Sequence, residues 1–145
     1  MQSSLDIESI MSDVFAEHGG AASVESFAER GIGAHHLQVR VCRGIIRRVL
    51  PGVYVPGAMP FELDERMRRV CALAWVGTAG WLSHETAAAM HGAWHRRSGQ
   101  VHVTAWNRER KPPVHWIEVH QTRDAAAGVI ELGGMRVSSF TQVAI

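Results

Sequence analysis

The stretch that decides the fold of the N-terminal half runs from Gly31 to Gly57 and reads GIGAHHLQVRVCRGIIRRVLPGVYVPG. Its first part, Ala34–Arg43, has helical apolar spacing and is followed by Gly44, a residue that commonly ends helices. Its second part has two β-branched runs around the turn signal Pro51-Gly52, which predicts a hairpin. The predicted strands are Ile45–Val49 and Val53–Val55.

Two further helices are expected before this stretch. Leu5–His18 has apolar residues at positions 7, 10, 11, 14 and 15, which is helical spacing, and Gly19-Gly20 ends it. Ser23 then caps a short helix that runs to Arg30. The resulting order of helix, helix, tight turn, helix and hairpin predicts a winged helix-turn-helix over residues 1–57.

Charge is segregated along this segment, although the net charge of the whole chain is only +1. Residues 1–29 contain no lysine or arginine and carry the acids Asp6, Glu8, Asp13, Glu17, Glu25 and Glu29. Residues 30–61 contain no acid and carry Arg30, Arg40, Arg43, Arg47 and Arg48. A local basic patch of this kind indicates a surface that binds a polyanion.

The helix over Ala34–Arg43 is the expected DNA-reading helix. Leu37, Val41 and Ile45 lie near one side of it and are expected to pack on the first two helices. The opposite side and the hairpin are expected to contact duplex DNA. The residues of this predicted interface are His35, His36, Val39, Arg40, Arg43, Arg47 and Arg48.

Two finer expectations concern the arginines of this interface. Arg40 lies mid-helix, where an arginine can pair bidentately with guanine in the major groove. Arg47 and Arg48 are adjacent on a strand and therefore point to opposite faces, so only one of them is expected to face DNA.

The second half predicts a small α+β domain over residues 62–145, after a linker at Pro56–Pro60. Its expected helices are Phe61–Val76 and Ser83–His91, and its expected strands are Val101–Ala105, Trp116–His120, Val129–Leu132 and Met135–Ser138. Because Phe140–Ile145 looks like the beginning of a helix, we expect this domain to be incomplete within the 145 residues. The whole chain is thus predicted to be α+β, with the winged helix first.

No pattern in the sequence predicts an enzyme or a cofactor. It contains no HExxH, GxSxG, Walker loop or glycine-rich dinucleotide turn. His102 and His120 are placed to meet across a sheet, but no cysteine cluster accompanies them, so structural roles are favoured over a metal site. Two cysteines, an N-terminus without a signal-peptide pattern and a longest apolar stretch of only Val70–Trp81 favour a cytoplasmic protein that does not enter a membrane.

These patterns together resemble the AbiEi family of type IV toxin-antitoxin antitoxins, in its actinobacterial form. The resemblance rests on the order of several segments along nearly the whole chain: Glu17–Ala22, Arg30–Ile32, Ile45–Val49, Gly52–Tyr54, Trp81–Gly92, Val101–Thr104, Val119–His120 and Gly134–Ser139. It implies an N-terminal domain that represses its own operon and a following domain that, with more chain, neutralises a nucleotidyltransferase-like toxin. The recognition helix is poorer in charge than is usual in the family, and relatives continue beyond Ile145.

The expected function is therefore that of a non-enzymatic, DNA-binding regulator of antitoxin type. Its expected partners are operator DNA, on which it would bind as a homodimer to an inverted repeat, and a toxin. One alternative is a protein-interaction module without specific DNA binding, in which loop tryptophans such as Trp94 and Trp106 anchor a partner. A weaker alternative is a nuclease-associated fragment whose catalytic domain lies beyond Ile145.

Overall fold

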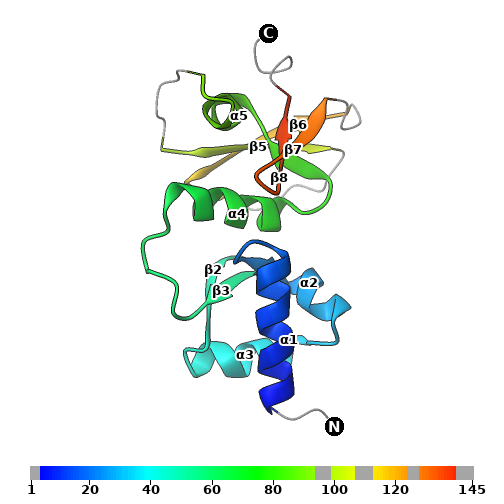
Figure 1. Ribbon diagram of the computed structural model, residues 1–145, viewed down its shortest axis with the longest axis vertical. Coiled ribbons are helices and arrows are strands. Elements are labelled where there is room, and N and C mark those ends of the chain that lie inside the picture. The colour runs from blue at the N-terminus through cyan, green and yellow to red at the C-terminus, as the bar shows by residue number, and fades with distance from the viewer. Residues whose placement is uncertain (1–3, 94–98, 107–112, 124–127, 140–145) are drawn as a thin grey trace. The chain divides into compact units, whose positions relative to one another are not determined.

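The computed structural model describes residues 4–93, 99–106, 113–123 and 128–139 and shows a mixed α+β chain (Figure 1). Its described helices are α1 (Ser4–Glu17), α2 (Val24–Glu29), α3 (Ala34–Cys42), α4 (Glu65–Val76) and α5 (His84–Met90). Its described strands are β1 (Ala22–Ser23), β2 (Ile46–Leu50), β3 (Val53–Pro56), β4 (Gly80–Leu82), β5 (Val101–Trp106), β6 (Ile117–Thr122), β7 (Val129–Leu132) and β8 (Met135–Ser138). The chain divides into two compact units, Met1–Trp75 and Val76–Ile145, so most of α4 goes with the first unit.

The first unit packs α1, α2 and α3 on a small sheet of order β1-β3-β2. Phe27 of α2 is fully buried at the centre, with Phe15 of α1 edge-on at 5.4 Å and Tyr54 of β3 at 6.3 Å between ring centroids. Edge-to-face aromatic pairs stabilise a core beyond what the burial of the ring area contributes. The apolar spacing of α1 therefore marks its buried side, because Ile7, Met11, Val14 and Phe15 are all buried in this core.

The hairpin of β2 and β3 has the predicted turn. Gly52 has φ +73, as a glycine at the third position of a type II turn requires. The Gly52 carbonyl accepts a hydrogen bond from the backbone N–H of Val24, which ties the turn to the start of α2. Strand β1 was not predicted from the sequence. It has only two residues and is held by antiparallel pairing of Ala22 with Tyr54 and of Ser23 with Val53.

The second unit is a five-stranded sheet of order β6-β5-β4-β8-β7, with α5 packed against β5 and β8. Strand β4 is central, antiparallel to β5 and parallel to β8, and all three of its residues are buried. Strands β5 and β6 run parallel, and β7 and β8 form the predicted hairpin around Gly133 and Gly134. The sheet core consists of Leu82, Val103, Val137 and their buried neighbours.

One expectation for the second half is wrong, and one strand was not predicted. The helix expected from Phe61 begins at Glu65, because the Asp64 carboxylate accepts the backbone N–H of Met67 at 2.8 Å and caps the helix there. Strand β4 was missed because it is a short, wholly apolar run without the alternation that marks a half-buried strand. The helix expected over Phe140–Ile145 lies outside the described residues. Among the described helices, none is both long and apolar enough to cross a bilayer.

Candidate functional site

Helix α3 exposes a different side from the one that the sequence suggested. Leu37 and Arg40 are the buried residues of the helix, with exposed fractions of 1% and 4%. Val41 and Ile45, which were expected to pack inward, are each 37% exposed. Because residues three and four apart share a helix face, the outer side of α3 is centred on Gln38. The exposed residues of α3 are Ala34, His35, Gln38, Val41 and Cys42.

Arg40 was expected to face the DNA groove, and that expectation of its position is wrong. The Arg40 side chain is buried, and its guanidinium Nη1 donates to the backbone carbonyl of His36 at 3.4 Å. The sequence placed Arg40 opposite an inner side made of Leu37, Val41 and Ile45, but the buried side of the helix runs through Leu37 and Arg40 instead. His36 and Val39 are half-buried beside it, whereas His35 and Arg43, the C-cap of α3, are exposed.

Arg47 and Arg48 of β2 have opposite environments, as strand alternation predicted. Arg47 is half-buried and donates to the backbone carbonyls of Met59 at 2.8 Å and Pro60 at 2.9 Å. Its guanidinium carbon also lies 5.6 Å from the centre of the Phe61 ring, a cation–π distance. Arg48 is exposed. Arg47 therefore holds the linker, and Arg48 is the one of the pair that is available to a ligand.

The basic segment thus presents fewer cations than its composition suggests. Arg30 forms an ion pair with Glu17 at 2.7 Å, which compensates its charge. With Arg40 buried and Arg47 engaged by the linker, Arg43 and Arg48 are the exposed arginines left from residues 30–61. Of the seven predicted residues, the structure leaves His35, Arg43 and Arg48 exposed, and it adds Gln38, which was not predicted although it lies four residues after Ala34 on the outer face.

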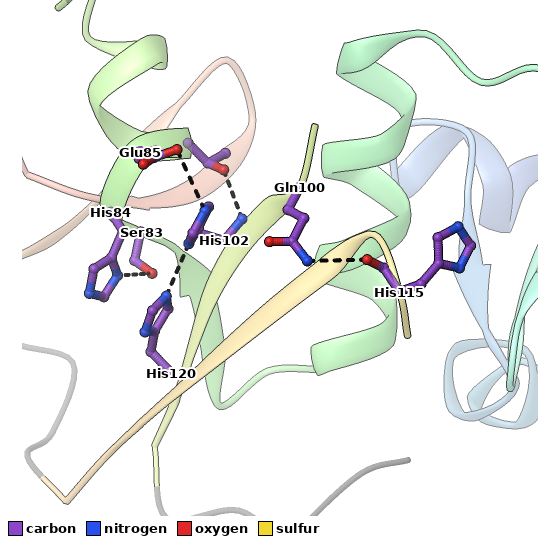
Figure 2. Close-up of polar contacts among 8 residues, drawn as sticks. Ser83, His84, Glu85, Gln100, His102, His115 and His120 are labelled. Carbon is purple, nitrogen blue, oxygen red and sulfur yellow. Dashed lines mark hydrogen bonds and ion pairs between the residues drawn. The ribbon is translucent and has the colours of Figure 1, made fainter. Parts of the chain in front are cut away.

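A second group of polar residues lies in the second unit, where three histidines converge from different elements (Figure 2). His84 begins α5, His102 lies on β5 and His120 lies on β6. Parallel pairing sets His120 opposite Thr104, so His102 and His120 share one face of the sheet two residues apart in register. We call His84, His102 and His120 the histidine cluster. The expectation that His102 and His120 meet across a sheet is confirmed.

Hydrogen bonds tie the histidine cluster to the start of α5. Thr104 Oγ1 donates to Ser83 Oγ at 2.7 Å, and Ser83 Oγ lies 3.0 Å from His84 Nδ1. Nδ1 of His102 lies 3.0 Å from Nε2 of His120, and Nε2 of His102 lies 3.8 Å from the Glu85 carboxylate. Figure 2 shows the contact of Ser83 with His84 and, beside it, the contacts of His102 with Glu85 and His120.

The rings of the histidine cluster are close enough for their charges to interact strongly. His84 and His120 are stacked with 3.6 Å between ring centroids and 18° between planes. Two unit charges at this distance repel by about 1 kcal/mol in water and by about 5 kcal/mol at an effective dielectric constant of about 20. Burial lowers the pKa of His84, and His102 lowers it further. Burial also lowers the pKa of His120, as do His84 and His102, while Glu118 partly raises it.

The described residues contain no group of three or more His, Cys, Asp or Glu side chains arranged to hold a metal ion. A scan against protein-family models and a search of curated proteins found no match to this chain.

Proposed function

We propose that this chain is a cytoplasmic, DNA-binding transcriptional regulator whose first unit binds duplex DNA as a winged helix-turn-helix. The observation that carries the proposal is the element order α1-β1-α2-α3-β2-β3 together with the sheet order β1-β3-β2. The turn between α2 and α3 contains Gly31 at φ +81, in keeping with the glycine-containing turn of helix-turn-helix motifs. In such proteins the second helix of the motif enters the major groove, which here is α3.

Some of the exposed residues are suited to contact bases, and others are suited to contact phosphates. His35 and Gln38 on the outer side of α3 carry hydrogen-bonding groups that suit base edges. Arg43 and Arg48 are exposed cations that suit phosphates, which fix position without reading sequence. His36 and Val39 flank this surface, whereas Arg40 is buried in α3 and Arg47 is bonded to the linker carbonyls.

The biological setting is proposed from the resemblance to AbiEi antitoxins. The regulator would bind an inverted repeat in its own operon as a homodimer and counteract a nucleotidyltransferase-like toxin. The order of the sequence segments is the support for this part of the proposal.

The test is equilibrium binding of the full chain to labelled duplex DNA at several salt concentrations. Each phosphate contact contributes about 0.9 to the slope of log affinity against log salt, so Arg43→Gln combined with Arg48→Gln is expected to reduce the slope by about 2. The matched control is Arg123→Gln, an exposed arginine of the second unit, which is expected to leave the slope unchanged. Absence of binding by the folded chain at low salt would overturn the proposal and favour the protein-interaction module.

A further inference from the structure

DNA recognition by α3 leaves the histidine cluster of the second unit without a role. We propose that His84, His102 and His120 form a proton-sensitive contact, which holds the start of α5 to β5 and β6 while the rings are uncharged and releases it when the cluster takes up protons in mild acid. The inference is independent of the proposed DNA binding, because it concerns only residues of the second unit.

The hydrogen bond between His102 and His120 limits how many protons the contact can hold. Only one hydrogen fits between the two ring nitrogens at 3.0 Å, so one of these nitrogens must be unprotonated. In one uncharged arrangement His120 Nε2–H donates to His102 Nδ1. His102 Nε2–H then lies 3.8 Å from the Glu85 carboxylate, too far for a hydrogen bond, and it is buried without a hydrogen-bond partner. If both rings become imidazolium, two N–H groups face each other and the bond is lost.

The contact of His84 likewise suits the uncharged ring. Ser83 Oγ accepts a hydrogen bond from Thr104, which leaves its own hydroxyl hydrogen to donate to an unprotonated His84 Nδ1. The His84 ring is also stacked at 3.6 Å on His120, so protonation of both rings sets two cations face to face.

Few charges near the histidine cluster offset such a gain of protons. Glu85 from α5 approaches His102 only to 3.8 Å with a half-exposed side chain. Glu118 from β6 is exposed, lies opposite His102 in the strand register and partly raises the pKa of His120. Strand β4 carries no charged residue, and Arg136 of β8, which packs on α5, donates instead to the carbonyls of Gly77 and Gly80. Two carboxylates therefore face three imidazoles, and neither makes a close ion pair with the stacked rings.

The backbone of His84 is strained as well. It has φ +51, and it is the one non-glycine residue with a positive φ in the part of the chain that the structure describes. Residues are held in this region by their surroundings at an energetic cost, and such strain concentrates at switch sites. Release of the ring from Ser83 and His120 allows the backbone to relax, which favours opening once the contact is protonated.

The direction of the pH dependence follows from proton binding. Because the pKa of His84 and that of His120 are lowered in the folded chain, the unfolded chain binds more protons below about pH 6.5. Stability therefore falls as the pH falls through this range and is regained above it.

The experiment is hydrogen–deuterium exchange of the full chain at about pH 7.5 and about pH 5, with protection corrected for intrinsic exchange. The amides of residues 84–90 and 117–122 are expected to lose protection about tenfold or more in acid, while β7 and β8 lose much less. His84→Asn is the informative variant, because asparagine tolerates a positive φ and can bond Ser83 but takes up no proton. Its acid-dependent loss is expected to be less than half that of the parent on a logarithmic scale.

The matched control is His115→Asn, which removes an exposed imidazole of the same unit outside the cluster and is expected to behave as the parent. NMR titration of the parent's imidazole C–H signals provides a readout that needs no variant, with the pKa of His84 and that of His120 expected below the ordinary imidazole value of about 6.5. Unchanged protection of residues 84–90 and 117–122 in acid would overturn the proposal. So would an acid-dependent loss in His84→Asn equal to that of the parent, or an effect of His115→Asn equal to that of His84→Asn.

Discussion

At the scale of single residues, the adjacent arginines of β2 have different roles because only one of them is hydrogen-bonded to the linker. Arg47 donates two hydrogen bonds to the linker carbonyls at Met59 and Pro60, whereas Arg48 is exposed. Arg47→Gln is therefore expected to lower the free energy of unfolding by about 1 kcal/mol, since its bonds are partly open to water. Arg48→Gln is expected to weaken binding to every duplex alike and to reduce the salt slope by about 1.

Chemical denaturation and DNA titration of both variants check this pair of outcomes. Equal losses of DNA affinity from the two substitutions, without a change in stability, would show that Arg47 serves the ligand and not the linker.

The two cysteines also differ in their exposure to solvent. Cys42 is exposed on α3, whereas Cys71 is buried in α4, where desolvation raises the pKa of its thiol to about 12 although Arg47 lowers it in part. The thiolate is the reactive form, so Cys71 is expected to be inert in the folded chain. A disulfide-exchange reagent should titrate one thiol rapidly in buffer and two in denaturant. Rapid reaction of both thiols in buffer would contradict the burial of Cys71.

At the scale of elements, the outer side of α3 predicts which bases the proposed regulator prefers. Gln38 is exposed there, and a glutamine pairs bidentately with adenine in the major groove. Duplexes selected from a random library are expected to carry an A·T pair at the position that Gln38 reads. Gln38→Ala should weaken the selected duplex by about 1–3 kcal/mol and leave random DNA unchanged.

The comparison variant is Arg40→Ala. Because Arg40 is buried, we expect the Arg40→Ala substitution to lower the stability of the fold. We expect no preferential loss of affinity for the selected duplex. A larger loss on selected than on random DNA for Arg40→Ala in a folded chain would restore the guanine-reading role that the sequence suggested.

The connection between α3 and the hairpin depends on Gly57. Its N–H donates to the Ile45 carbonyl at 2.9 Å, and a Cβ added to it would lie 2.0 Å from the Gly44 carbonyl oxygen. Gly57→Ala must therefore separate two backbone segments and is expected to cost about 2–4 kcal/mol of stability. Gly33→Ala is the control, because a Cβ there meets nothing within 4 Å and its φ is −88. Similar thermal midpoints for the two variants would contradict this packing.

At the scale of the whole molecule, each unit has its own core. Phe27 is fully buried in the first and Leu82 in the second. Phe27→Ala is expected to destabilise the first unit by about 3–5 kcal/mol and to abolish DNA binding. Leu82→Ala, at about 2–5 kcal/mol, should disturb the second unit and leave most DNA affinity in place. Near-ultraviolet circular dichroism and DNA titration of both variants measure this. Loss of affinity in Leu82→Ala as complete as in Phe27→Ala would show that the units do not act separately.

Much of the fold could be predicted because most of its helices and strands have a local pattern of apolar and turn residues. The apolar spacing of α1, the glycine turn before α3 and Pro51-Gly52 in the hairpin each act within a few residues of chain. Strands β1 and β4 escaped prediction because two or three residues carry no period of their own and become strands only by pairing with distant partners.

The candidate sites were less predictable, since a side chain's availability depends on contacts made far along the chain. Arg40 and Arg47 look alike in the sequence to Arg43 and Arg48, and only packing separates them. The meeting of His102 and His120 could be anticipated from two neighbouring strands. The contact of His84 with His120 could not be anticipated, because it depends on how α5 packs against the sheet.

The sequence by itself therefore determined the helices and the longer strands of this protein and the segregation of acids and arginines between residues 1–29 and 30–61. Hydrophobic period, turn chemistry and charge need no distant partner to be expressed. Only the tertiary structure decided which arginines are exposed and that three imidazoles stack across α5, β5 and β6. Burial and side-chain contact are properties of the packed chain, because they arise from residues that the fold, and not the sequence, brings together.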